Sequence, residues 1–489
     1  MMRTHWPQVQ LASVWLLGVV LSGCTVGPDY ATPDLSVRFG ESWSETNSKT
    51  QQASDSELSR WWRSFGDDEL VELIERSLSS NLDLLEAQER IIAARARRGV
   101  VNADRMPTLD ADAEYSRTER GSDAPMQMGF VPERSFDTFS GGVVAGWEAD
   151  LWGRVSRLVE AADAEIDLSV EDYRAVRVTI AAEVAREVLS IRAIDDRLAV
   201  LARAIEVDRE FIEITRARAR AGLVSELDLL RAERTASVNR AARKPLLGER
   251  RAAEHRIAML AGERPGSILV AQKPQAIAPP IPDLGLPADL LVRRPDIRSA
   301  ERAFAAAVAR IGAAQADRYP RVVFGGSFVL GGSDVGDLVD PNTRVLSFGP
   351  RVTLPLFEGG RIRSNITRAE SDARSAHLRL EQRALNAVRE VETALARLDR
   401  ARDRVAELEA AFESARDSEQ LATSLYSAGN IDFINVLEAR TERLAIEELL
   451  ATARLDVLNE SVNISVALGG GWSVQPTATA QEGVLSLSK

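Results

Sequence analysis

Hydrophobic and polar residues alternate with a period of two in four short stretches, which lie at Leu109–Tyr115, Phe139–Leu151, Val322–Leu330 and Leu346–Leu356. In each stretch apolar side chains face one side, and small or acidic side chains face the other. Such alternation over roughly ten residues is typical of membrane-spanning β-strands, but a half-buried soluble sheet has the same pattern. The loops within each pair, 117–135 and 331–343, are rich in Gly, Asp, Pro and Ser, as exposed hairpin loops are.

Two long runs have a different pattern. Residues 154–221 and 361–428 each contain no Gly and no Pro over 68 residues, and Ala, Glu, Arg and Leu fill them. These residues favour helices, whereas Gly and Pro break them. At about 1.5 Å per residue, a continuous helix of that length spans roughly 100 Å. The runs therefore predict two rods that bridge a distance, and a break in either rod would contradict this interpretation.

Each rod ends at an Ala-Gly pair, and a second helical pattern follows it. We expect return helices from Leu223 through Lys244 and beyond, and from Asn430 to Leu468, each antiparallel to its rod. Pro245 lies inside the first return helix. Because proline removes a backbone hydrogen bond, it predicts a kink or break there, to which we assign no function.

The two halves of the chain repeat each other. Residues 87–107 align with residues 300–320 without a gap, with 10 identities in 21 positions. The rods repeat at an offset of 207 residues, and the segments just after them also correspond. These matches indicate an internal duplication. Four strands cannot close a membrane barrel, which starts at about eight, so strands that enter a membrane would require several chains to share one barrel.

The N-terminus has the features of a secretion signal. An apolar segment at Leu11–Leu21 precedes Leu-Ser-Gly and Cys24, the only cysteine. About 11 apolar residues are too few for a spanning helix, which needs roughly 20. The motif resembles a bacterial lipobox, in which the cysteine becomes the lipidated first residue; an ordinary cleavage site that contains a cysteine is the alternative. No other apolar stretch reaches 18 residues, so any membrane crossing must use strands.

Composition argues against several functions. The net charge is −12, the pI is near 5.1 and no basic face stands out, which argues against a nucleic-acid partner. Only three histidines exist, and no phosphate loop, dinucleotide motif or nucleophile elbow occurs. Asp110-x-Asp112-x-Glu114 begins like a calcium loop, but Tyr115 replaces the required Gly. We therefore expect no enzyme activity, no cofactor and no metal site.

Several motifs, taken together in chain order, resemble the outer-membrane efflux proteins, the TolC-like channels, in their lipoprotein branch typified by OprM and NodT. They are Cys24–Tyr30, Trp62–Leu70, Trp147–Arg154, Leu286–Ile297, Phe348–Arg361 and Ala467–Trp472. The resemblance covers nearly the whole chain. It implies a mainly α-helical protein with a membrane β-barrel: a homotrimer with a shared twelve-stranded barrel in the outer membrane, above a long α-helical tunnel in the periplasm.

The implied organisation divides the chain into six segments. They are a signal peptide at 1–23, an extended lipid-anchored segment at 24–60, a first efflux repeat at 61–262, an equatorial linker at 263–290, a second repeat at 291–468 and a flexible tail at 469–489. Strands are expected at about 108–152 and 321–357, and tunnel helices at 154–262 and 361–468. Thr25 after Cys24, in place of Asp, resembles the signal that sorts a lipoprotein to the outer membrane.

The resemblance also implies a periplasmic aperture at the hairpin tips. The tips that would contact a periplasmic adaptor are Gly222, Leu223, Val224 and Ser225, and Gly429, Asn430, Ile431 and Asp432. Rings of apolar and acidic side chains map to Ile434, Asn435 and Glu438. A tether between hairpins maps to Asp228 and Tyr426. Ile431 and Asn435 depart from the basic and acidic residues used elsewhere in the family, which favours a looser or more apolar closure. A solvated surface charge is the alternative role for Glu438.

The expected function is a passive exit duct for drugs or other toxic small molecules. The resemblance implies two partners, an adaptor of the membrane fusion protein class and an inner-membrane pump of the proton-driven type. Two alternatives stay open: a duct for type I protein secretion, and a periplasmic coiled-coil scaffold with no pore.

Overall fold

The computed structural model describes residues 25–35, 43–44, 55–119, 135–273, 290 and 293–473. The expected signal peptide, Cys24, most of the linker and most of the C-terminal tail lie outside this part. The chain divides into two compact units. The first comprises residues 1–33, 91–169 and 300–380, and the second comprises residues 34–90, 170–299 and 381–489.

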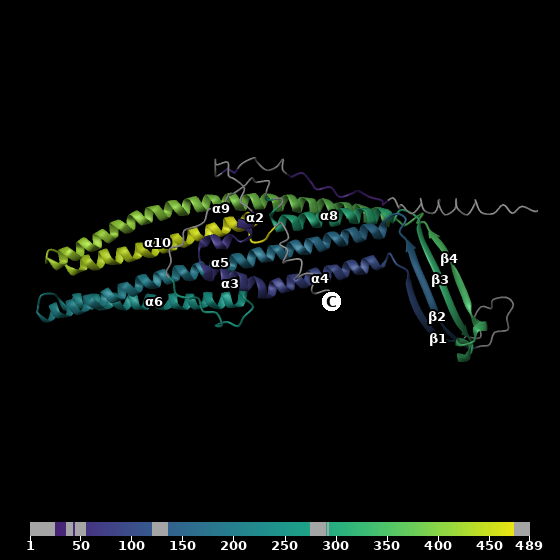
Figure 1. The fold of residues 1–489 in the computed structure, drawn as a ribbon, viewed down its shortest axis with the longest axis horizontal. Helices are drawn as coiled ribbons and strands as arrows, with labels where there is room; N and C mark the ends of the chain where they lie inside the picture. The colour runs from purple at the N-terminus through teal and green to yellow at the C-terminus, as the bar shows by residue number, and fades with distance from the viewer. Residues whose placement is uncertain are drawn as a thin grey trace, which may run out of the picture. The chain divides into compact units, whose positions relative to one another are not determined.

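Both predicted rods are confirmed as single helices. Helix α5 (Arg154–Arg220) and helix α9 (Arg361–Ser427) each run for 67 residues without a break. Each is followed by an antiparallel return helix, α6 (Glu226–Leu260) after α5 and α10 (Phe433–Ala467) after α9 (Figure 1). Within the described residues, none of these or the other helices combines the length and the apolarity that a membrane crossing requires.

The duplication is visible in the lengths of the elements. Helices α4 (Leu82–Ala103) and α8 (Pro295–Ala316) both have 22 residues, and α6 and α10 both have 35. Strands β1 (Thr108–Glu119) and β3 (Arg321–Gly332) both have 12 residues. Each repeat therefore has the order helix, strand, strand, long helix, return helix.

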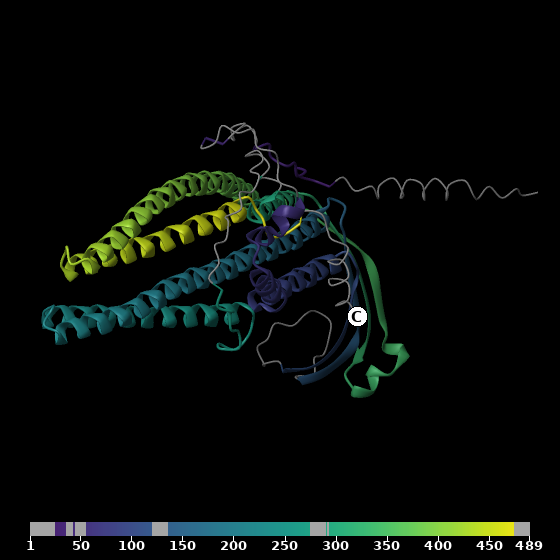
Figure 2. The same cartoon turned by 60° about the vertical axis from the view of Figure 1, so that its left-hand side comes forward.

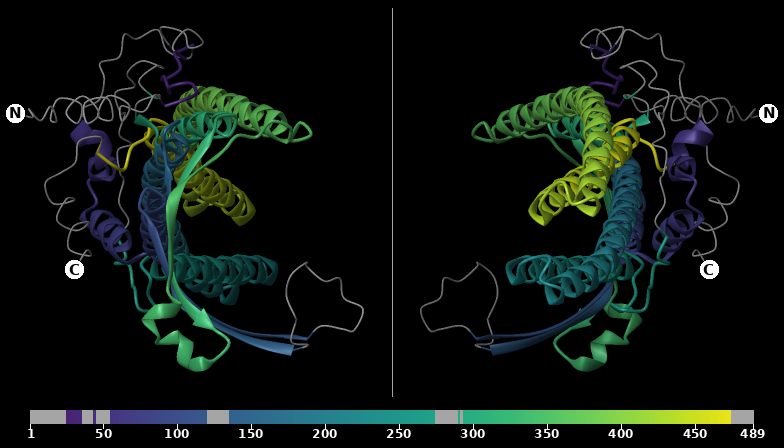
Figure 3. Two further views of the ribbon diagram at one scale, coloured as in Figure 1. Left: turned by 90° about the vertical axis from the view of Figure 1, so that its right-hand side faces the viewer. Right: turned by 90° about the vertical axis from the view of Figure 1, so that its left-hand side faces the viewer.

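The four predicted stretches form one antiparallel sheet in the order β1-β2-β3-β4, completed by β2 (Ser135–Ala149) and β4 (Val345–Thr353). The sheet curves along its strands (Figures 2 and 3). The connection between β3 and β4 contains two short turns of 3-10 helix, η3 (Val335–Leu338) and η4 (Pro341–Thr343). Residues 120–134, between β1 and β2, lie outside the described part.

Apolar side chains lie on the same face of the sheet across all four strands. Ala111 pairs with Val143, Val143 with Phe328, and Phe328 with Leu346, so one rung is apolar throughout. This apolar face is not buried by the chain itself, since Phe348 is 86% and Leu346 is 67% exposed. An exposed apolar face argues against the alternative of a half-buried sheet in a soluble protein. A large apolar surface of this kind is normally covered by lipid or by another protein.

Three short elements precede the first repeat's rod: α2 (Asp55–Ser59), η2 (Trp61–Phe65) and α3 (Asp68–Ser80). Trp62, Leu70 and Ile74 from these elements are fully buried, and they pack with residues 180–191 of α5 and the end of α6 in the core of the second unit. This core holds η2 and α3 against α5 and α6.

The break expected at Pro245 does not occur, because α6 is continuous from Glu226 to Leu260. Proline at this position cannot donate to the carbonyl of Ala241. Residues 241–245 are all exposed, so that carbonyl can be solvated by water, while Leu246 beside them is 4% exposed and anchors the helix. The lost hydrogen bond is therefore tolerated without ending the helix.

Candidate functional site

The two hairpin tips have the same backbone design. At the end of α5 the N–H of Gly222 donates to the carbonyl oxygen of Ala219, and the N–H of Leu223 donates to that of Arg218, at 3.0 and 2.9 Å. The equivalent pair at the end of α9 starts from Gly429. This Schellman arrangement needs a left-handed residue, and both glycines supply it with φ of +69° and +77°. Leu223 at the first tip is 74% exposed.

Asp228 caps its own helix. Its carboxylate accepts hydrogen bonds from the N–H and hydroxyl of Ser225, at 3.3 and 2.9 Å, and the Ser225 hydroxyl oxygen accepts one from the N–H of Asp228. This capping box begins α6. The Asp228 carboxylate also lies 3.5 Å from the guanidinium of Arg231. The predicted tether partner therefore has local partners within its own chain.

Tyr426 lies in an apolar cluster near the second tip. Its side chain is 7% exposed and packs with Phe433, Val436 and the partly buried Ile431, while the guanidinium of Arg218 lies 4.9 Å from the ring centroid. The Tyr426 hydroxyl has no hydrogen-bond partner among the residues that the structure describes. The hydrogen bond between Asp228 and Tyr426 is thus not formed within the chain, and the tether between hairpins stays a prediction.

A buried ion pair joins the two hairpins farther from the tips. Arg440 of α10 and Asp208 of α5 are 3% and 4% exposed, and Arg440 Nη1 lies 3.1 Å from Asp208 Oδ1. Arg440 Nη2 donates to the carbonyl oxygen of Ala204 at 2.6 Å. The amide of Asn239 on α6 donates to the other Asp208 oxygen at 2.8 Å. Asp208 therefore connects both helices of the first hairpin to the second.

Further charges extend this contact along α9 and α10. Glu419 of α9 pairs with Arg443, and it lies 3.8 Å from Arg440 Nε. Arg443 also contacts Glu447 at 2.5 Å. Burial lowers the pKa of Arg440, and the charges of Asp208 and Glu419 offset this effect only in part. A buried guanidinium of this kind depends on its carboxylate partners.

The three predicted ring residues lie on the opposite side of α10 from this buried contact. Asn435 and Glu438 are exposed and Ile434 is half-buried. Phe433 and Val436, which alternate with them in sequence, are 2% and 1% exposed. The side chains expected to form rings are therefore available for contacts outside the chain.

The segment that follows Cys24 is bound at the start of α5. The N–H of Val26 donates to the carbonyl oxygen of Trp152 at 3.1 Å. Arg157, whose side chain is 4% exposed, donates to the carbonyl oxygen of Val26 at 3.2 Å and to the carboxylate of Asp29 at 2.7 Å. A polar segment without secondary structure is thus fixed by one buried arginine.

Two further contacts hold this segment against α8. Gly27 has φ of +104°, and a Cβ there would lie 2.3 Å from the Cα of Gly312, so the two backbones approach too closely for any side chain. The Tyr30 hydroxyl donates to Glu301. Burial, reinforced by that hydrogen bond, raises the pKa of Tyr30 to about 12, which keeps the hydroxyl a donor at all relevant pH values.

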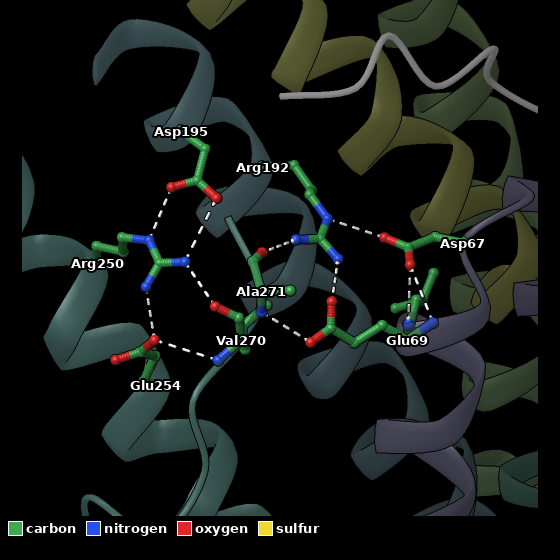
Figure 4. A network of polar contacts seen from close by, with 9 residues as sticks. Asp67, Glu69, Arg192, Asp195, Arg250, Glu254, Val270 and Ala271 are labelled. Atoms are coloured by element: carbon green, nitrogen blue, oxygen red, sulfur yellow. Dashed lines mark hydrogen bonds and ion pairs between the residues drawn. The ribbon is translucent and has the colours of Figure 1, made fainter. Parts of the chain in front are cut away.

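In the second unit, Arg192 of α5 contacts the start of α3. Its guanidinium lies 2.9 Å from Asp67 and 2.7 Å from Glu69 (Figure 4). The other Asp67 oxygen accepts the N–H groups of Glu69 and Leu70 and caps α3. Burial by itself raises the pKa of Asp67. The hydrogen bond and charge of Arg192 outweigh it, together with the two amides, and leave that pKa below its ordinary value.

The main chain of residues 270–271, at the start of the expected linker, is held by charged side chains alone. Both N–H groups donate to carboxylates, and both carbonyl oxygens accept from guanidinium groups (Figure 4). The contacts are Glu254 and Arg250 to Val270, at 3.2 and 2.7 Å, and Glu69 and Arg192 to Ala271, at 2.8 and 2.6 Å. This network fixes the linker between α6 and α3.

Arg440, Asp208 and Arg192 are not among the site residues predicted from the sequence. A signal for Arg440 was present, because it continues the spacing of Phe433 and Leu437 and so falls on the buried face of α10. Across the described residues, no group of three or more His, Cys, Asp or Glu is placed to hold a metal ion. The geometry of the site is that of helix tips and interhelical contacts.

Comparison with known proteins places the chain in a family. A family model described as "Outer membrane efflux protein" matches residues 73–263 and 286–470. The chain is 33% identical to outer membrane protein OprJ of Pseudomonas aeruginosa over 469 residues, which cover 94% of this chain and 95% of OprJ. It is 30% identical to nodulation protein T of Rhizobium leguminosarum bv. trifolii, covering 94% of this chain and 97% of that protein.

A solved structure of the outer-membrane channel OprN matches with a TM-score of 0.82 and 33% identity, covering 92% of this chain and all of that chain. The chain belongs to the outer membrane efflux protein family. It is an outer-membrane efflux channel that extends into the periplasm, and it is not an enzyme.

Proposed function

We propose that this chain forms the passive exit duct of a tripartite efflux system and releases drugs or other toxic small molecules. The observation that carries the proposal is the pair of unbroken 67-residue rods. At one end α5 begins five residues after strand β2, and at the other it ends at a glycine tip. A helix of that length reaches roughly 100 Å, which suits a conduit that crosses the periplasm.

Three copies supply the membrane part of the duct. One copy contributes four strands whose apolar face is exposed, and its outer strands β1 and β4 have no further neighbour within the described part of the chain. An open strand edge is not tolerated in lipid, so the edges must be joined. A homotrimer closes twelve strands into one barrel, with the acidic residues of β1 facing the lumen.

The hairpin tips form the periplasmic gate in this proposal. In a trimer three Glu438 side chains surround one axis, together with Ile434 and Asn435. Their combined negative charge favours passage of cations, and their mutual repulsion favours opening. The tips at 222–225 and 429–432 contact the adaptor, a membrane fusion protein, which links the duct to an inner-membrane pump that uses the proton gradient. The exposed Leu223 provides an apolar contact for that adaptor.

Lipid on Cys24 anchors the duct to the outer membrane, and Thr25 directs it there. The binding of residues 26–30 supports this anchor, because these residues lie at the start of α5, next to the strand end of the rod. The expected segment boundaries, from the signal peptide at 1–23 to the tail at 469–489, fit this arrangement.

Conductance in a planar lipid bilayer tests the proposal. The purified trimer should produce discrete channel openings, whereas a coiled-coil scaffold without a pore would leave the bilayer silent. Deletion of the gene should sensitise cells to small toxic compounds. Loss of a secreted protein with unchanged drug sensitivity would instead identify a duct for type I secretion.

A further inference from the structure

The internal duplication extends to the hydrogen-bonding register of the sheet. Thr108 of β1 pairs with Gly146 of β2, and Arg321 of β3 pairs with Thr353 of β4. Residue 321 lies 213 positions after residue 108, and residue 353 lies 207 positions after residue 146. The same two offsets separate α4 from α8 and α5 from α9. The two hairpins are therefore one structure repeated in identical register.

The junction between the two repeats is observed once within the chain. Strand β2, the last of the first repeat, pairs with β3, the first of the second repeat, and Ala145 lies opposite Gly326. The opposite junction, from β4 to a following β1, has no counterpart in one copy. All nine residues of β4 are exposed, as are the first eight of β1. These two edges are the unpaired ends of a repeating array.

We infer that β4 of one copy pairs antiparallel with β1 of the next copy, in the register that places Val352 opposite Ala113. The register follows when the two offsets are applied to the junction already seen, since residue 352 corresponds to residue 145 and residue 113 corresponds to residue 326. The inference rests on the proposed trimer and adds to it the residue pairs that join the copies.

This register keeps both faces of the sheet continuous. Ala113 lies opposite Gly141 and Val352 lies opposite Val322, and both belong to the apolar face. If β4 slipped by one residue relative to β1, the apolar side chains of one strand would lie on the same face as the polar side chains of the other. The duplication distinguishes the proposed register from a slip of two residues, which would preserve the faces.

Charge on the opposite face is also complementary. The proposed register places Arg351 of β4 directly opposite Glu114 of β1, and both residues are exposed in the single copy. Opposite charges at such a position stabilise a strand pair, whereas like charges destabilise it. Arg351 and Glu114 are therefore the polar contact expected between neighbouring copies.

Cysteine pairs test the register in the assembled protein in outer-membrane vesicles. Residues directly opposite have Cβ atoms about 5 Å apart, and a shift of two residues increases this to about 7–8 Å, beyond the reach of a disulfide. Val352→Cys with Ala113→Cys should form covalent trimers on oxidation. Val352→Cys with Ala111→Cys, shifted by two residues on the same face, should not. Each single variant controls for Cys24.

Two additional pairs make every result decisive. Gly349→Cys with Ser116→Cys tests the same register on the other face. Opposite residues in an antiparallel pair alternate between hydrogen-bonded and non-hydrogen-bonded positions, so one of the two cysteine pairs always has the closer, non-hydrogen-bonded spacing. Ala145→Cys with Gly326→Cys is the equivalent rung within the chain, and its intrachain disulfide shows that oxidation works. Covalent trimers only from a shifted pair would overturn the register and leave the barrel intact. Intrachain product without any intersubunit product would overturn the register too, and channel openings from the same variant in a planar bilayer would show that the shared barrel itself still forms.

Discussion

Arg440 on α10 and Asp208 on α5 form an ion pair of 3.1 Å that is buried between the two hairpins of one copy. The tips were expected to be tethered by Asp228 and Tyr426, yet the tie within a copy is made here, about three helical turns from the end of α5. If the second hairpin moves relative to the first, the ion pair must therefore break. If the pair stays intact, the two hairpins must move as one body.

Substitution Arg440→Ala should destabilise the folded protein by about 3–5 kcal/mol, because it leaves Asp208 buried without its partner. Denaturant unfolding followed by circular dichroism measures this loss. Arg454→Ala is the matched control. It removes an arginine of the same helix whose pair with Glu409 is half-exposed, so the expected cost is at most about 1 kcal/mol. Equal losses in the two variants would argue against a special role for the buried pair.

The proposed tether predicts that Asp228→Ala combined with Tyr426→Phe increases single-channel conductance in a planar bilayer. The Tyr426 hydroxyl has no partner among the described residues, so its removal should cost little folding energy within one chain. Ser225→Ala is the control, since it breaks the same helix cap but keeps the Asp228 carboxylate. Unchanged conductance in the double variant would contradict the tether.

Neutralising Glu438 should reduce cation selectivity if three copies face one axis. In a potassium chloride gradient, the reversal potential of Glu438→Gln should move toward zero, because the ring of negative charge is lost. Glu409→Gln removes an exposed acid of α9 far from the tip and should leave the potential unchanged. A reversal potential equal to that of the wild type would mean that Glu438 is a solvated surface charge.

Cys24→Ser should abolish incorporation of radioactive palmitate into the protein. The acceptor would be the thiol of the only cysteine, so no second site can replace it. Gel autoradiography of labelled cells measures the change, with Thr25→Ser as a control that keeps the thiol. Persistent labelling of the serine variant would exclude the lipid anchor.

The depressed pKa of Asp67 predicts a stability that depends on acid pH. A carboxylate whose pKa is lower in the folded state stabilises that state above its unfolded pKa of about 3.9, and the contribution is lost as the pH falls through the lower folded value. Thermal unfolding should therefore show Asp67→Asn below the wild type at neutral pH, with the gap narrowing below about pH 4. Asp456→Asn, which removes the acid of a half-exposed ion pair, is the matched control and should cost at most about 1 kcal/mol at neutral pH. A gap that stays constant with pH would contradict this assignment.

Much of the fold follows from local pattern. The absence of helix breakers predicted both rods to within one residue, and alternation of apolar residues predicted all four strands. These features depend on neighbours within a few residues. Whether Pro245 would break α6 could not be predicted in this way, because its cost depends on whether the orphaned carbonyl meets water, and that requires knowing that residues 241–245 are exposed.

The polar contacts between distant segments could not be predicted in the same way. Arg192 and Asp67 are 125 residues apart, and Arg440 and Ala204 are 236 apart. Helical spacing assigns Arg440 to a buried face, but it does not identify the carboxylate that neutralises it. Such pairings depend on how the hairpins pack, and a rod rich in Arg and Glu offers many equivalent candidates.

The binding of residues 26–30 at the start of α5 has a consequence for how the duct sits in the bilayer. With lipid on Cys24, the acyl chains would leave the protein two residues, at most about 7 Å of extended chain, before Val26, whose carbonyl oxygen is bound by Arg157. A lipidated copy would therefore fix its own depth at the membrane surface. In the proposed trimer three such points define a plane, so the anchors would resist tilting of the whole duct.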